Sequence, residues 1–144
     1  MNQITRVKNG LVAALNGLVK ADGSGVLKSV VHHPIRAGST IYPPVIGVAV
    51  SRVRRETTTW FADVALMLAA GKGSDTPEDA VLETLAEVDA VVEAFIDTFA
   101  VGGSLDQPTW DLWYDAPNTN SPLQLVGAIG AMRIRIEGPL KMDE

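Results

Sequence analysis

Two neighbouring stretches of this sequence alternate between apolar and other side chains over an unusual length. The first stretch is Val45–Arg55 and the second is Thr58–Ala70. The positions that share one face are Ile46, Val48 and Val50 in the first stretch and Ala62, Val64, Leu66 and Leu68 in the second. A period of two is the pattern of a β-strand with one buried face. The short polar segment between the stretches permits a turn, so we expect one long antiparallel hairpin, although the turn lacks an Asn-Gly signal.

Helical periodicity dominates two other segments. Residues 3–21 carry one apolar stripe, and Asn2 precedes it as a potential N-cap. A second helix is predicted from Thr76, as N-cap, with Pro77 at its first position, to about Phe99. The stripe of the first helix contains Ile4, Val7, Leu11, Leu15 and Leu18; that of the second contains Val81, Leu82, Leu85, Val88, Val92, Phe95, Ile96 and Phe99. The second helix carries acidic side chains on its other face, at Glu83, Glu87, Asp89, Glu93 and Asp97.

Three shorter patterns complete the chain. Strands are predicted at Val26–His33, at Thr109–Tyr114 and in the alternating stretch from Val126 to Glu137. Loops are predicted where proline, glycine and asparagine gather, at Pro34–Pro44, Gly71–Asp75 and Ala116–Pro122. The order helix, strand, hairpin, helix, strand shows no repeated strand–helix alternation. It predicts a single α+β domain over residues 1–144, with about four mainly antiparallel strands and both helices packed on one face.

Composition restricts the chemistry available to this chain. Its 144 residues include no cysteine, which excludes disulfides, thiolate metal sites and cysteine nucleophiles. No apolar stretch reaches the ~20 residues of a membrane span, so we expect a cytosolic protein without a membrane partner. The net charge of −5 is segregated. Residues 1–55 carry eight basic and one acidic side chain (+7), and residues 56–144 carry four basic and sixteen acidic ones (−12). Such asymmetry is typical of a nucleic-acid surface, of a protein-partner surface or of two oppositely charged faces of one domain.

No segment of the sequence matches a motif for catalysis. Gly71-Lys72-Gly73-Ser74 follows a predicted strand, but Leu66 replaces the first glycine of a phosphate-binding P-loop and the following helix start is acidic. His32 and His33 are adjacent and would point to opposite faces of a strand, so they cannot chelate one metal ion together. The acidic helix face is expected in water, whereas general acid–base catalysis usually needs a carboxylate that lies in a cleft. We therefore expect no catalytic residue, no cofactor and no metal site, and a protein that is not an enzyme.

Two sets of side chains are candidates for protein interfaces. Arg52, Arg54 and Arg55 lie near the tip of the expected hairpin and could contact a protein partner or a neighbouring subunit. Trp110, Trp113 and Tyr114 concentrate aromatic area in a short segment, and tryptophan and tyrosine are common interface anchors. An alternative for the aromatic set is that it closes one end of the core.

The order of these segments resembles that of the tail terminator proteins of long-tailed bacteriophages, which are head–tail joining or tail completion proteins. The segments that carry the resemblance are the helix Ile4–Val19, the proline-bearing Ile41-Tyr42-Pro43-Pro44-Val45, the hairpin Val45–Ala70, the acidic helix Thr76–Phe99 and the late strand ending in Ala131-Met132-Arg133-Ile134-Arg135-Ile136. The resemblance covers nearly the whole chain, but it is one of pattern, because the family has no diagnostic motif.

The resemblance implies a structural virion protein in the tail or neck, assembled in the host cytoplasm. Its partners would be five further copies in a homohexameric ring, the tail tube protein and the head connector or another neck protein. The ring would cap the tube, and genomic DNA would pass through its lumen without sequence-specific binding. The alternatives are another neck protein, such as a head-closure protein, and a small-molecule-binding α+β domain with a pocket between sheet and helices.

Overall fold

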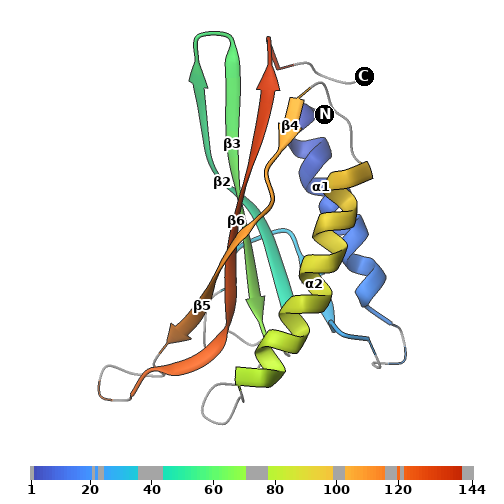
Figure 1. The fold of residues 1–144 in the computed structure, drawn as a ribbon, viewed down its shortest axis with the longest axis vertical. Coiled ribbons are helices and arrows are strands. Elements are labelled where there is room, and N and C mark those ends of the chain that lie inside the picture. Colours follow the sequence, from blue (N-terminus) through green and yellow to red (C-terminus); the bar gives the residue numbers. More distant parts are fainter. Residues whose placement is uncertain are drawn as a thin grey trace.

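The computed structural model describes residues 2–20, 22, 25–35, 44–70, 78–98, 103–115, 120 and 122–140. These residues form an α+β structure in which two helices pack on a sheet (Figure 1). The helical elements are α1 (Gln3–Leu15), the 3-10 turn η1 (Asn16–Leu18) that continues it, and α2 (Glu78–Thr98). The strands are β1 (Ser29–Val31), β2 (Val45–Glu56), β3 (Thr59–Ala69), β4 (Gly103–Leu105), β5 (Thr109–Asp115) and β6 (Gln124–Glu137).

The sheet is built around β3 and β6. These two strands pair antiparallel from Thr59↔Glu137 to Ala69↔Gly127. β2 pairs antiparallel with the other edge of β3, and β1 adds to β2 in parallel. On its far edge β6 pairs with β5 near its start and with β4 near its end, so the sheet has six strands in five positions.

The prediction of a long hairpin is confirmed, and so are the strands near Thr109 and Val126. The predicted strand Val26–His33 is confirmed in its centre, as β1. The prediction of about four antiparallel strands was wrong in two respects. The described residues contain six strands, and β1 is parallel to its neighbour. β4 was not predicted, because three residues are too few for an alternation to be visible in a sequence. The predicted loop Gly71–Asp75, the cap Thr76 with Pro77, and Phe99 lie outside the described residues, as do residues 36–43 and most of 116–122.

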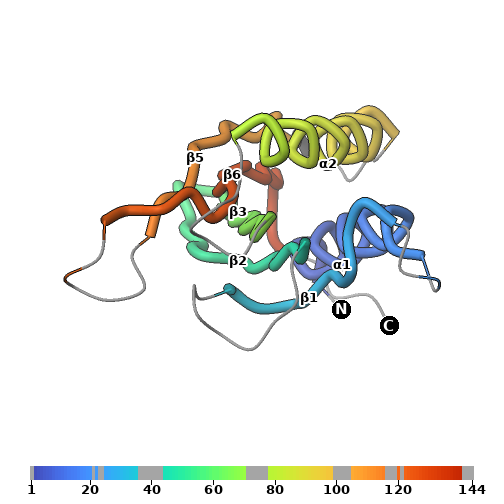
Figure 2. The backbone as a smooth tube through the Cα atoms, turned by 90° about the horizontal axis from the view of Figure 1, so that it is seen from below, coloured from blue at the N-terminus to red at the C-terminus, as the bar shows by residue number. Residues whose placement is uncertain are grey.

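Both helices cover the same face of the sheet (Figure 2), which we call the helix-side face; the opposite one is the outer face. The predicted N-cap of α1 is confirmed, because the Asn2 Oδ1 atom accepts a hydrogen bond from the Thr5 backbone N–H at 2.8 Å. The helix ends earlier than expected, at Leu15, and continues only as a 3-10 turn. No helix among the described residues is both long and apolar enough to cross a membrane.

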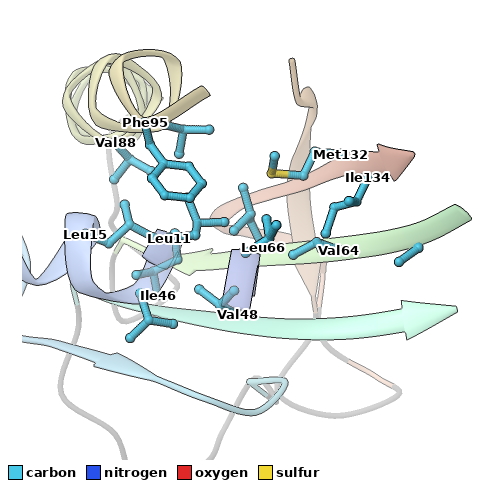
Figure 3. Close-up of a cluster of buried hydrophobic side chains, with 14 of the residues drawn as sticks. Leu11, Leu15, Ile46, Val48, Val64, Leu66, Val88, Phe95, Met132 and Ile134 are labelled. Atoms are coloured by element: carbon cyan, nitrogen blue, oxygen red, sulfur yellow. The ribbon is translucent and has the colours of Figure 1, made fainter. Parts of the chain in front are cut away.

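The core lies between the helices and the helix-side face (Figure 3). It joins Leu11 and Leu15 of α1 to Val88 and Phe95 of α2. The strands contribute Ile46, Val48, Val64, Leu66, Met132 and Ile134 to the same cluster. Every buried side chain of the described residues is apolar. Burying a side chain of this size stabilises the fold by about 1.5–3 kcal/mol before the entropy of ordering is subtracted.

β2 changes the phase of its side chains at Ser51. Its register against β3 skips one residue between Val50 and Arg52, which is a β-bulge. The Ser51 hydroxyl donates to the backbone carbonyl of Asp63 at 3.2 Å. Before the bulge, even-numbered side chains face the helices; after it, Arg52 and Arg54 face outward, level with Asp63 and Phe61. An uninterrupted alternation would direct both guanidinium groups towards the core.

The far end of the sheet projects beyond the helices. Figure 1 shows the ends of β2, β3 and β6 rising together above α1 and α2. The tip is a short turn in which Thr57 has φ of 58°, a left-handed conformation that a β-branched residue seldom adopts. Residues 55–58 are all exposed. The two hairpin strands have 12 and 11 residues, about twice the usual strand length of ~5–6 residues.

Substitutions at two glycines should distinguish the effect of close packing on the free energy of unfolding from that of chain entropy. A Cβ atom at Gly127 would lie 1.7 Å from the Leu68 carbonyl oxygen, whereas one at Gly17 would meet no atom within 4 Å. We expect Gly127→Ala to lower the free energy of unfolding by about 1–3 kcal/mol, because backbone must move. Gly17→Ala should raise it by about 0.4–1 kcal/mol, because only the unfolded chain is restricted. Urea unfolding followed by circular dichroism measures both; equal effects of the two substitutions would contradict this account.

Candidate interaction surface

Four arginines gather on the outer face of the projecting sheet. The strand registers place them in two adjacent rows across three strands. The first row is Arg52, Asp63 and Arg133, and the second is Arg54, Phe61 and Arg135. We call these six residues the arginine face. Sequence analysis identified Arg52 and Arg54 but missed the other four. The alternation of Arg133 and Arg135 in the last strand was the available signal, and only the β3–β6 pairing brings it to the hairpin.

The arginine face is held in shape by stacking and by ion pairs. The guanidinium group of Arg54 lies 5.0 Å from the centre of the Phe61 ring, and that of Arg133 lies 5.8 Å from it. Arg133 also donates from Nε to the Asp63 Oδ1 atom at 3.0 Å. At these partly exposed positions each cation–π contact is worth about 0.5–1 kcal/mol and each ion pair about 0–1 kcal/mol. Their main effect is to orient planar groups that would otherwise move freely.

A third row of side chains lies towards the tip and supplies two carboxylates. Arg54 pairs with Glu56 at 3.0 Å, and Arg135 pairs with Glu137 at 2.6 Å. The Glu137 Oε2 atom also accepts a hydrogen bond from the Thr59 hydroxyl at 2.9 Å. Three of the four arginines therefore have a carboxylate partner. Within the part of the chain that the structure describes, Arg52 makes no ion pair, and it is exposed.

The charge balance of this surface favours a protein partner. Four guanidinium groups stand beside three carboxylates, which leaves one net positive charge. Binding to a nucleic-acid backbone depends on an excess of cations that displaces counterions, and this surface has little excess. Arginine and aromatic side chains are enriched at protein interfaces. Arg55, the third arginine of the predicted set, lies apart on the helix-side face, where its guanidinium group is 5.8 Å from the Trp60 ring.

The aromatic set of β5 divides between the two faces of the sheet. Trp110 packs on the helix-side core, over Gly130, where an added Cβ atom would lie 2.7 Å from the indole ring. Its Nε1 atom donates to the Asp89 Oδ1 atom of α2 at 2.8 Å. Trp113 instead joins a small cluster on the outer face, with Ile35, Val45 and Ala69 at its centre. Only Tyr114 is largely exposed, at 48%.

The two predicted sets do not meet within one chain. Arg52 and Arg54 belong to β2, and the aromatic residues belong to β5, which lies across β3 and β6 from it. The described residues hold no group of three or more histidine, aspartate or glutamate side chains that could bind a metal ion. Comparison with models of protein families finds no match to this chain, and comparison with curated proteins finds none.

The packing of Trp110 distinguishes the two interpretations of the aromatic set. We expect Trp110→Ala to lower the free energy of unfolding by about 2–4 kcal/mol, because it removes a packed indole and leaves Asp89 without its donor. Tyr114→Ala should change it by less than about 0.5 kcal/mol, because the side chain is exposed. Chemical unfolding followed by far-ultraviolet circular dichroism provides the comparison. If Trp110→Ala changes the free energy of unfolding only slightly, Trp110 is not a core residue, and its interpretation as an interface anchor is favoured.

Proposed function

We propose that this chain is a structural virion protein of a long-tailed bacteriophage, similar to a tail terminator. Copies of the chain form a ring, six-fold as in the resembled family, that caps the tail tube and joins it to the head connector. Its partners are other copies of itself, the tail tube protein and a neck protein. Genomic DNA passes through the lumen without sequence-specific recognition. The protein is assembled in the host cytoplasm and stays in the neck of the virion.

The observation that carries this proposal is the projecting end of the sheet. Three long strands end beyond the helices and bear an ordered arginine face around Phe61 next to that end. The tip itself adds nothing to the core, because residues 55–58 are all exposed. Exposed long strands also invite aggregation unless something covers them. Such a surface is expected where another protein binds, and a tail terminator acts by binding other proteins.

The mechanism follows from binding specificity. A cap must bind the end of the tube more favourably than another tube subunit does, and it must offer no fresh surface for growth. The stacked arginines suit this task because their geometry is set before contact. Less side-chain entropy is therefore lost when a partner carboxylate or carbonyl binds. Arg133 and Arg135 of β6, which lie level with Asp63 and Phe61, are the best placed for such contacts.

The proposal predicts an effect on the length of tail tubes. Purified protein mixed with polymerising tube subunits from the same genome should shorten the tubes seen by electron microscopy. The double variant Arg133→Ser/Arg135→Ser should need a concentration about tenfold higher or more for the same shortening, because it removes two oriented donors from the contact. The matched control is Lys20→Ser/Lys28→Ser, which removes the same charge from exposed positions elsewhere.

The control should shorten tubes as the wild type does. Equal loss of activity in both double variants would mean that only net charge matters, and would contradict a specific role for the arginine face. If the wild type has no effect on tube length, the terminator function is wrong. Binding of the protein to the head connector without any effect on tubes would favour a head-closure protein instead.

A further inference from the structure

The sheet has two open edges within the part of the chain that the structure describes. On one side, β1 covers the outer edge of β2 only from Val45 to Gly47. From Val48 to Glu56 this edge of β2 has no neighbour among the described residues. On the other side, β5 pairs with β6 and with no other described strand. Open edges present unpaired backbone N–H and C=O groups, which are ready to accept another strand.

The side chains along the two open edges complement each other. The β2 edge carries Arg52 and Arg54 on its outer face, and between them Val53 on the helix-side face, where it is 46% exposed. The β5 edge carries Asp111 on the outer face, level with Ile129, and beside it Leu112 on the helix-side face, level with Ala128. Asp111 is exposed. One edge therefore alternates cation and apolar side chain, and the other alternates anion and apolar side chain.

We propose that β5 of one copy adds to the open edge of β2 of the next copy, as an antiparallel strand. The inference rests on the proposed function for the existence of a ring and specifies how its subunits join. In this register Leu112 lies opposite Val53, and Asp111 lies opposite Arg54 and diagonal to Arg52, within reach of both long side chains. The carboxylate then supplies the partner that Arg52 lacks.

The direction of the strands agrees with this junction. β2 is antiparallel to β3, β3 to β6, and β6 to β5, so β5 runs opposite to β2 within one chain. Copies related by an axis along the strands keep these directions, and β5 of one copy arrives antiparallel to β2 of the next. The two edges are different surfaces, so the contact is head-to-tail. Such contacts produce closed rings when the rotation between copies closes, whereas identical surfaces would stop at a dimer.

The required stagger between copies has the size expected of a closed sheet. Within one chain Asp111 is level with Gly47 of β2, through Ile129 and Met67. Moving it beside Arg54, which is level with Phe61, takes six steps along β3, or about 20 Å. Four strand spacings, from β5 across β6 and β3 to β2 and the next β5, span about 19 Å across the sheet. The ratio corresponds to strands tilted by about 46°, close to the upper end of the ~35–45° tilt of strands in closed sheets.

Cysteine cross-linking tests the junction directly, because the chain has no native cysteine. The double variant Arg54→Cys/Asp111→Cys, oxidised under mild conditions, should yield a ladder of covalent oligomers on non-reducing gels. An equimolar mixture of the two single variants should yield a covalent dimer that contains one copy of each. Each single variant alone should yield no more cross-linked dimer than its reduced control. The pair Arg54→Cys with Glu87→Cys, on the exposed face of α2, is the matched negative pair.

A charge exchange provides a second test that needs no oxidation. Arg54→Asp and Asp111→Arg should each weaken self-association by about tenfold in sedimentation, because each places like charges opposite one another. Mixing the two variants should restore association, since every Arg54→Asp subunit then meets an Asp111→Arg edge. Recovery on mixing shows that residue 54 of one copy meets residue 111 of another. The covalent ladder then distinguishes a head-to-tail junction from a two-fold dimer, which would stop at two copies.

The outcomes separate the junction from the function. A ladder together with recovery on mixing supports the junction even if the protein leaves tail tubes unaffected, which would reject only the terminator function. Capping of tubes by the wild type without cross-linking or recovery would reject the junction and leave the function standing. A wild-type protein that stays monomeric at all concentrations, with and without tube subunits, would overturn the junction. Circular dichroism of every variant confirms that folding is preserved.

Discussion

The pairing of β3 with β6 is the interaction on which the rest of the structure depends. It is uninterrupted over eleven residue pairs, from Thr59↔Glu137 to Ala69↔Gly127. One face of this ladder carries Val64, Leu66 and Ile134 into the core beneath the helices. Its other face aligns Asp63 with Arg133 and Phe61 with Arg135. The same backbone hydrogen bonds thus fix both the apolar interior and the charged exterior, and neither can shift register without the other.

The elements with a long, periodic apolar pattern were predictable from the sequence. The hairpin, the two helices and the last strand were predicted because each repeats its apolar pattern over three or more periods. β4 was not predicted, because a three-residue strand has no period. β1 was predicted, but too long and without its parallel pairing to β2. The bulge at Ser51 was also invisible, since Arg52 and Arg54 continue the parity of Val48 and Val50 in the sequence. Only the pairing with β3 reveals that the phase has changed.

The candidate surface was predictable in part for a related reason. Arg52, Arg54 and Arg55 were identified because they lie close together in the sequence. Adjacent residues of a strand point to opposite faces of the sheet, so Arg55 lies on the helix-side face and the other two lie on the outer face. Arg133 lies far away in the sequence and next to Phe61 in space. For Trp110, composition alone could not distinguish an interface anchor from a core residue. The hydrogen bond to Asp89 and the contact with Gly130 show that this indole is built into the packing between sheet and helix.

Helix α2 has a further consequence for how the domain folds. It carries seven carboxylates and no basic residue, including the pairs Glu83 with Glu87 and Glu93 with Asp97 at a spacing of four. Each such like-charge pair disfavours an isolated helix by about 0.2–0.5 kcal/mol, and Asp97 near the C-terminus opposes the helix dipole. The stability of the helix therefore depends on the packing of Val88, Val92 and Phe95 against the sheet. We therefore expect α2 to consolidate only after the strands beneath it, and the pairing of β3 with the distant β6 to limit the rate of folding.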